Sequence, residues 1–146
     1  MSTLVTDSGS YLTPRLEHAR VSDAMRHGIL SCRSDASMRD AARTMALHHV
    51  HTIIVSDPRS DVPLGSISDT ELVDVLLDEH AEDRPLADIA QRELLAISAD
   101  ESLVAAARLM RQHHTAHLIV RDPSTQRPVG MLSTLDLAGV LAWGES

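Results

Sequence analysis

Two stretches of the sequence place a hydroxyl group and a carboxylate three residues apart. "GSISDTEL" contains Ser68 and Glu71. "GMLSTLDL", 65 positions further on, contains Ser133 and Asp136. Such a serine can accept a hydrogen bond from a backbone N–H at the start of a helix while the acid closes a capping box. The same two groups at a helix start could instead hold the phosphate and the sugar of a nucleotide. The spacing alone leaves both interpretations open.

Histidines recur at two equivalent places. The segments 48–51 ("HHVH") and 113–117 ("HHTAH") stand where the hydrophobic pattern changes from helical to strand-like. A zinc site needs three or four converging ligands, and neither Cys32 nor an acidic cluster lies nearby in the sequence. Histidine near the C-terminus of a helix interacts favourably with the helix dipole. We therefore favour a structural or capping role for these histidines, with contact to a phosphate or to a metal ion as the alternatives.

Arginine is the usual partner of phosphate, because its planar fork matches two oxygens at once. Five arginines lie on predicted elements that could line or border a cleft and so could contact a phosphate. They are Arg26, Arg43, Arg108, Arg121 and Arg127. The alternative for each of them is a solvated side chain on the surface.

Signatures of catalysis are missing from the sequence. It contains no Gly-x-Ser-x-Gly elbow, no Gly-x-x-x-x-Gly-Lys phosphate loop and no His-Glu-x-x-His. Asp57 and Asp122 each precede a proline and are better explained as turn residues than as catalytic acids. We therefore expect no enzymatic activity, no catalytic residues and no required cofactor.

The composition argues against several classes of partner. The formal net charge is -8, and all 13 basic residues are arginines. A nucleic-acid groove normally shows a basic excess and exposed aromatic rings, whereas Tyr11 and Trp143 are the only aromatic residues of the chain. No apolar run approaches the roughly 18 residues of a membrane helix, and the N-terminus lacks the pattern of a signal peptide. We expect a cytoplasmic protein with neither nucleic acid nor membrane as partner.

Two minor features complete the composition. The single Cys32 is interpreted as a small, buried hydrophobic residue. Lys, Asn and Phe are all absent, which is typical of a GC-rich genome and suggests a bacterial source.

The sequence contains an internal repeat. Residues 21–77 align with residues 86–142 at a constant offset of 65, without a gap. Matched identities include Asp23/Asp88, Met45/Met110, His48/His113, Gly65/Gly130 and Ser68/Ser133. A repeat of this length indicates two copies of one structural unit. Because a unit of under 60 residues buries only a marginal core, we expect the copies to pack face to face.

Each copy predicts the order helix, strand, helix, strand, strand, helix. Apolar residues at steps of three and four predict the long helices, with Asp35 or Ser34 as the first N-cap and Asp100 as the second. Short β-branched runs predict two strands that a turn joins, and the serine-acid stretch opens the last helix. The predicted ranges are 37–49, 52–55, 64–67 and 69–77 in the first copy and 102–114, 117–120, 129–132 and 134–142 in the second.

With these elements in place, the chain resembles a pair of CBS (cystathionine beta-synthase) domains, also called a Bateman module. The resemblance rests on "VSDAMRHGILSCRSDASMRDAARTMALHHVHTIIVSD", on Gly-x-x-Ser-x-x-acid before the last helix and on the duplication. It implies an α/β (α+β) fold of two α-β-α-β-β-α repeats with pseudo-two-fold symmetry. The implied division is a tail (1–19), a first repeat (20–77), a linker (78–85), a second repeat (86–142) and a C-terminal tail (143–146).

The resemblance implies a regulatory module that binds an adenosine-containing nucleotide, such as AMP, ADP or ATP, in a cleft between the repeats. The serine and the acid would bind phosphate and ribose, and the residues after the first short helix and at the start of the hairpin strand would pack on the adenine. For the second repeat, the implied residues are Ser133, Asp136, Ile89, Ala90, Gln91, Leu118 and Ile119. For the first repeat, they are Ser68, Glu71, Met25, Arg26, Thr52 and Ile53.

The two acids differ by one methylene group. The family motif ends in Asp, and the extra carbon of Glu71 shifts its carboxylate by about 1.5 Å. A capping box prefers Glu at this position, so Glu71 favours a cap and Asp136 favours nucleotide binding. We expect a homodimer that signals to an effector protein on another chain. A ligand-free interaction scaffold and a metal-responsive module built on the histidines are the alternative functions.

Overall fold

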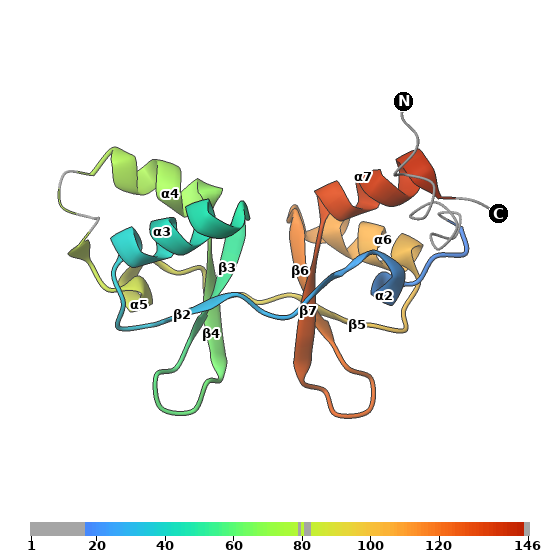
Figure 1. The fold of residues 1–146 in the computed structure, drawn as a ribbon, viewed down its shortest axis with the longest axis horizontal. Helices are drawn as coiled ribbons and strands as arrows, with labels where there is room; N and C mark the ends of the chain where they lie inside the picture. Colours follow the sequence, from blue (N-terminus) through green and yellow to red (C-terminus); the bar gives the residue numbers. More distant parts are fainter. Residues whose placement is uncertain (1–16, 79, 81–82, 145–146) are drawn as a thin grey trace. The chain divides into compact units, whose positions relative to one another are not determined.

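The computed structural model describes residues 17–78, 80 and 83–144 (Figure 1). Most of the predicted tail 1–19, three positions of the predicted linker 78–85 and residues 145–146 lie outside the described residues. The described residues form two compact units. The central unit is Ile29–Leu94, and the terminal unit joins the residues up to Gly28 to those from Leu95 onward.

A three-stranded sheet with helices packed against it forms the central unit. The sheet has the order β2-β3-β4, with β2 parallel and β4 antiparallel to β3. Its elements are β2 (Ser31–Arg33), α3 (Met38–His48), β3 (Thr52–Ser56), β4 (Pro63–Ser68), α4 (Asp69–Leu76) and α5 (Leu86–Ile89).

The terminal unit repeats this plan with one added strand. Its sheet has the order β1-β7-β6-β5, and β1 pairs with β7 in antiparallel fashion. Its elements are α2 (Val21–Ala24), β1 (Arg26–His27), β5 (Ala96–Ser98), α6 (Leu103–His113), β6 (His117–Arg121), β7 (Pro128–Ser133) and α7 (Thr134–Trp143).

Each unit takes its opening helix from the other copy of the sequence. In Figure 1, yellow-green α5 lies among the cyan and green elements of the central unit, and blue α2 lies beside orange α6. The backbone N–H of Leu86 donates to Ala36 O at 2.8 Å, and that of Val21 donates to Glu101 O at 2.8 Å. Leu86 and Val21 are fully buried at these equivalent positions. The compact units therefore differ from the sequence copies by an exchange of their opening segments.

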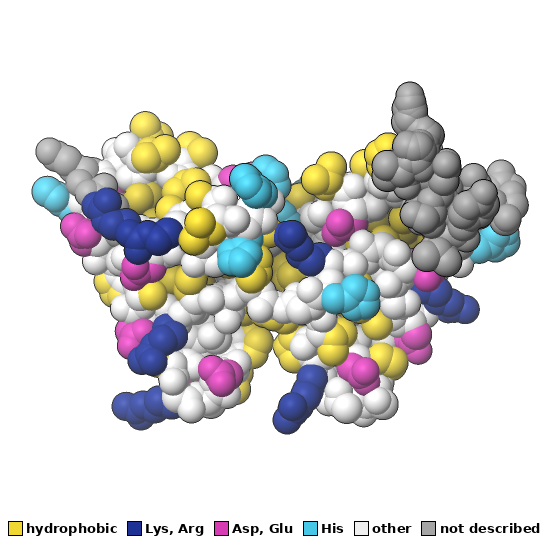
Figure 2. Space-filling model, in the orientation of Figure 1, with side chains coloured by type: hydrophobic (Ala, Val, Ile, Leu, Met, Phe, Trp, Pro, Cys, Tyr) yellow, Lys and Arg dark blue, Asp and Glu magenta, His cyan; other side chains and the backbone are white. Residues whose placement is uncertain are grey.

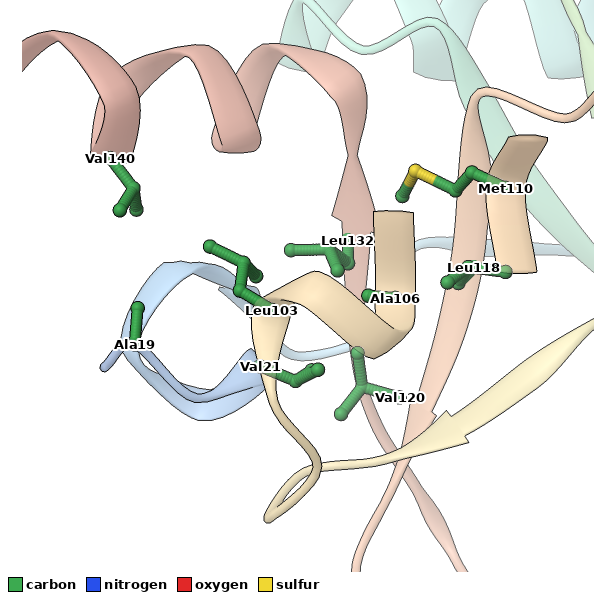
Figure 3. Packing of buried hydrophobic residues seen from close by; sticks show 9 residues of the cluster. All are labelled: Ala19, Val21, Leu103, Ala106, Met110, Leu118, Val120, Leu132 and Val140. Atoms are coloured by element: carbon green, nitrogen blue, oxygen red, sulfur yellow. The ribbon is translucent and has the colours of Figure 1, made fainter. Parts of the chain in front are cut away.

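Each unit has its own hydrophobic core. Figure 3 shows the core of the terminal unit, where α2, α6 and α7 bury side chains against β6 and β7. Burying each aliphatic side chain contributes about 1.5–3 kcal/mol, so a core of this size is the main stabilising feature of its unit. The terminal core contains Ala19, Val21, Leu103, Ala106, Met110, Leu118, Val120, Leu132 and Val140. The central core contains Met38, Ala41, Met45, Ile53, Val55, Ile67, Val75 and Leu86.

The predicted N-caps of the long helices are wrong. Ser37 caps α3 by accepting from the backbone N–H of Asp40, and Ser102 caps α6 by accepting from that of Ala105. The acids expected in this role have other partners. Asp35 accepts from Arg33, and that hydrogen bond lowers the pKa of Asp35 below its usual value. Asp100 accepts instead from the hydroxyl of Ser98.

The histidines at the ends of the long helices and the single cysteine can now be compared with their predicted roles. His49 and His114 end α3 and α6 in the left-handed conformation, with φ of 54° and 52°, and so they are C-caps. Cys32 is only half-buried, and its Sγ lies 3.6 Å from Thr44 Oγ1, so it is not the fully buried residue expected. Among the described residues, no helix is long and apolar enough to cross a membrane.

Candidate functional site

In the central unit, Ser68 and Glu71 form a closed capping box at the start of α4. Glu71 Oε1 accepts from the backbone N–H of Ser68 at 2.7 Å and from its hydroxyl at 2.8 Å. The Ser68 hydroxyl oxygen accepts in turn from the backbone N–H of Thr70 at 3.3 Å. Glu71 is only 4% exposed, which is unusual for a carboxylate. Its burial is possible because it is hydrogen-bonded.

The second oxygen of Glu71 has a partner from the exchanged segment. Gln91 Nε2 lies 3.3 Å from Glu71 Oε2. Backbone hydrogen bonds hold Gln91 in place, since Gln91 and Ser66 donate to each other's carbonyl oxygens at 2.9 Å. Both carboxylate oxygens of Glu71 are therefore engaged within the central unit.

In the terminal unit, Ser133 and Asp136 form the equivalent box at the start of α7. Asp136 Oδ2 accepts from the backbone N–H of Ser133 at 2.8 Å and from its hydroxyl at 3.0 Å. The backbone N–H of Asp136 donates to Ser133 Oγ at 3.3 Å. Asp136 is half-buried, and Oδ1 has no hydrogen bond to any described residue. The carboxylate thus keeps one oxygen available for another partner.

The position that Gln91 occupies in the central unit belongs to Arg26 in the terminal unit. Arg26 pairs with Met131 across β1 and β7, as Gln91 pairs with Ser66. The two pairs are equivalent, because the repeat offset of 65 relates Arg26 to Gln91 and Ser66 to Met131. Arg26 is exposed, and within the described part of the chain its side chain makes no hydrogen bond or ion pair. The two units therefore place different side chains at this position.

Two glycines allow the exchanged segments to approach the sheets. A Cβ atom on Gly130 would collide with the carbonyl oxygen of Arg26, and one on Gly65 would collide with that of Gln91. A collision with the backbone cannot be relieved by moving a side chain, so both positions require Gly.

The structure groups the predicted nucleotide-binding residues differently from the sequence analysis. Met25 and Arg26, expected beside Ser68 and Glu71, belong to the terminal unit with Ser133 and Asp136. The segment 89–91, which holds Ile89, Ala90 and Gln91, belongs instead to the central unit with Ser68 and Glu71. This regrouping follows from the exchange of opening segments, which an offset between two sequence copies does not reveal.

The predicted residues on the central strands keep their units, but they face different ways. Leu118 and Ile53 belong to the hydrophobic cores. Thr52 lies opposite Ser68 in the sheet, and its hydroxyl donates to the carbonyl of Ile67 at 3.0 Å. Ile119 is also buried but belongs to neither core cluster, because it points to the opposite face of its strand.

The histidines of the two clusters lie where the long helices end. His51 Nδ1 lies 3.3 Å from Asp69 Oδ2, and both side chains are largely exposed. Over residues 17–78, 80 and 83–144, no group of three or more His, Cys, Asp or Glu side chains is arranged to hold a metal ion.

Comparison with known proteins identifies the repeats. The model of the CBS domain matches residues 21–78 and again residues 86–142. No curated protein matches the chain.

Solved structures, CBS-domain proteins among them, have the same fold. An uncharacterized conserved protein from Pyrococcus horikoshii has 20% identity and a TM-score of 0.76, with 84% of this chain and 92% of that chain covered. A CBS domain protein from Pyrobaculum aerophilum complexed with AMP has 22% identity and a TM-score of 0.76, with 85% and 96% covered. A CBS domain pair in complex with 5′-methylthioadenosine and S-adenosyl-L-methionine has 18% identity and a TM-score of 0.74, with 85% and 96% covered. These likenesses confirm the predicted fold.

Proposed function

The chain belongs to the CBS-domain family, and from this premise we propose that it is a regulatory module that binds one adenosine-containing ligand through its terminal unit. The observation that carries the proposal is the contrast between the two acids. Asp136 retains a carboxylate oxygen without a partner in the described chain, whereas both oxygens of Glu71 are engaged.

The chemistry of the terminal unit suits a ribose. A ribose carries two adjacent hydroxyl groups, which donate to a carboxylate oxygen, and hydrogen bonds to charged groups are stronger than those between neutral groups. Asp136 Oδ2 is fixed by Ser133, so Oδ1 is held in one place rather than free to rotate. We propose that Asp136 binds the ribose, and that Ser133 and Ile119 border the ligand.

The ligands of two structural relatives support this choice of chemical class. The Pyrobaculum aerophilum protein is complexed with AMP, and the domain pair is in complex with 5′-methylthioadenosine and S-adenosyl-L-methionine. All three compounds carry adenine on a ribose with two adjacent free hydroxyl groups, and they differ in the substituent on the 5′ carbon. The shared ribose is the part of the ligand that the proposal assigns to Asp136.

The central unit has a different role in this proposal. A ligand that approached Glu71 would have to displace Gln91. The buried carboxylate would then lose the hydrogen bond to its Oε2 atom, which carries a cost in free energy. We therefore assign Ser68 and Glu71 to capping α4.

A ligand regulates a protein only through different affinities for two states. We propose that occupancy of the terminal unit changes the association of the chain with a second copy or with an effector protein. Exposed apolar side chains on α4 and α7 are suited to such a contact (Figure 2). They are Val73, Leu76, Leu135, Leu141 and Trp143, which are 57–79% exposed.

A thermal-shift panel tests the proposal. The compounds are AMP, ADP, ATP, S-adenosylmethionine, cyclic di-AMP and zinc chloride. The variant Asp136→Glu keeps a capping box, because Glu71 forms one in the equivalent place, but it moves the carboxylate. We expect an adenosyl compound to raise the melting temperature of the native chain and to have no effect on Asp136→Glu. The matched control Glu71→Asp should keep the response.

Two results would contradict the proposal. If no adenosyl compound shifts the melting temperature at millimolar concentration, the chain is an interaction scaffold without this ligand. If zinc alone gives a shift, a metal-responsive module is the better account.

A further inference from the structure

Equivalent positions in the two units hold side chains of different charge. Gln91 and Arg26 occupy the same place in the repeat, each paired through its backbone with the strand that leads into the serine-acid box. In the central unit, the side chain of Gln91 reaches the acid, with Nε2 3.3 Å from Glu71 Oε2. A side chain at this position is therefore directed at the box.

The sheet geometry of the terminal unit leads to the same conclusion for Arg26. Arg26 lies directly opposite Met131, and Met131 lies opposite Ile119 on β6. Residues directly opposite each other in an antiparallel pair project to the same face, and Ser133, two residues beyond Met131, projects there too. Leu132, between them, points into the core instead (Figure 3). Diagonal neighbours such as Arg26 and Ser133 are separated by about 7–8 Å, which an arginine side chain spans.

The guanidinium of Arg26 and the carboxylate of Asp136 do not form an ion pair with each other. Arg26 forms no ion pair with a described residue, and Asp136 is paired with Ser133 rather than with a cation. In the central unit the corresponding groups, Gln91 and Glu71, are joined by a hydrogen bond. The terminal unit therefore has a guanidinium group and a carboxylate oxygen, Asp136 Oδ1, that both lack a hydrogen-bonding partner among the described residues.

Building on the proposed adenosine site, we propose that Arg26 is a specificity-determining residue that selects ligands with an anionic 5′ substituent. If Asp136 holds the ribose hydroxyls, the guanidinium can pair with a phosphate on the 5′ carbon through two parallel hydrogen bonds. 5′-Methylthioadenosine offers it a neutral thioether. S-adenosylmethionine places a sulfonium cation next to the 5′ carbon and its carboxylate several bonds further away, so neither compound has an anion where AMP has its phosphate. The site should therefore prefer AMP to both.

Isothermal titration calorimetry of the full chain tests this assignment. The ligands are AMP, adenosine, 5′-methylthioadenosine and S-adenosylmethionine. The variant Arg26→Gln gives the terminal unit the side chain that the central unit already accommodates. The control Arg111→Gln removes the same charge from an exposed position of α6 in the same unit.

We expect the native chain to bind AMP about tenfold more tightly than adenosine or 5′-methylthioadenosine, the lower end of what a charge-assisted hydrogen bond provides. Arg26→Gln should remove this preference by weakening AMP binding to the level of adenosine, while Arg111→Gln should retain it. The AMP preference should also weaken with added salt, since the guanidinium is exposed.

Each contrary result has its own meaning. If adenosine binds but the ratio of AMP to adenosine affinity is the same in the native chain and in Arg26→Gln, the role of Arg26 is overturned while the proposed function stands. If no adenosyl compound binds to the native chain, the proposed function fails, and the role of Arg26 fails with it.

Discussion

The central and terminal units share a plan but treat their acids in opposite ways. In the central unit, Glu71 is buried and a glutamine from the exchanged segment completes its hydrogen bonds. In the terminal unit, Asp136 is half-buried and the equivalent exchanged residue is an exposed arginine. One methylene and one charge thus separate a carboxylate with both oxygens hydrogen-bonded from one that uses a single oxygen in its capping box. Duplicated units can keep a common fold while their equivalent acids differ in what they are able to bind.

The largest expected effect concerns the exchange of opening segments. A fragment of residues 29–94 contains the complete central unit, whereas a fragment of residues 20–77 follows the sequence copy and lacks α5. Loss of Leu86 alone removes about 1.5–3 kcal/mol of stabilisation, because its side chain is fully buried. A unit of this size has only a marginal core, so the loss should prevent stable folding. We expect cooperative thermal unfolding, followed by circular dichroism, for 29–94 and not for 20–77. Equal cooperativity of the two fragments would show that the exchange is dispensable.

The close approach of β1 to β7 predicts the next largest effect. Gly130→Ala places a Cβ against the carbonyl oxygen of Arg26, and overpacking of this kind costs about 1–3 kcal/mol. Gly139→Ala is the matched control, because nothing lies within 4 Å of its Cβ and alanine favours the helix by up to about 1 kcal/mol. Urea denaturation should show opposite signs for the two variants. Destabilisation by both would contradict the assignment of Gly130 to close approach.

Truncation of the equivalent side chains Gln91 and Arg26 should affect stability differently in the two units. Gln91→Ala leaves the buried Glu71 Oε2 without its partner, which costs about 1–3 kcal/mol. Arg26→Ala removes an exposed side chain without a described partner and should leave the free energy of unfolding within about 0.5 kcal/mol of the native value. Chemical denaturation of both variants checks the contrast. A similar cost for the two would mean that Arg26 has a structural contact as important as that of Gln91.

The smallest expected effect distinguishes the two long helices. Asp40 closes the capping box of α3, and its hydrogen bond from the Ser37 backbone lowers the pKa of Asp40. Ala105 stands at the equivalent place in α6. A group whose pKa is lowered by folding stabilises the folded state when the pH is above the usual pKa of Asp. This stabilisation is lost as the pH falls through the lowered pKa of the folded state. The slight drop in melting temperature caused by Asp40→Ala should therefore be present at neutral pH and shrink below about pH 4. A drop that does not change with pH would refute this reasoning.

The sequence predicted most of the element order but not the partners of the opening segments. Hydrophobic periodicity and turn residues identify the long helices and the central strands, because local patterns determine these elements. Position 26 aligns with position 91 in the repeat, yet nothing local indicates that Gln91 contacts Glu71 rather than Asp136. That pairing depends on tertiary packing of two four-residue helices. The N-caps were missed for a local reason, since Ser37 and Ser102 follow equally plausible capping residues by only a few positions.

The sequence already shows that Glu71 and Asp136 differ in residue type, and the structure shows how the hydrogen bonding of the two carboxylates differs. A buried glutamate with both oxygens engaged was not predictable from the capping box alone, because Oε2 is satisfied by a residue 20 positions away in the sequence. The availability of Asp136 Oδ1 depends in the same way on which residue the exchanged segment supplies.

The stoichiometry of AMP binding tests the central claim most directly. Isothermal titration calorimetry of the native chain should give one AMP per chain, and Asp136→Glu should abolish the binding heat while Glu71→Asp leaves the terminal site intact. Two equivalent AMP molecules per chain, or binding that survives Asp136→Glu and depends on Glu71, would contradict the account.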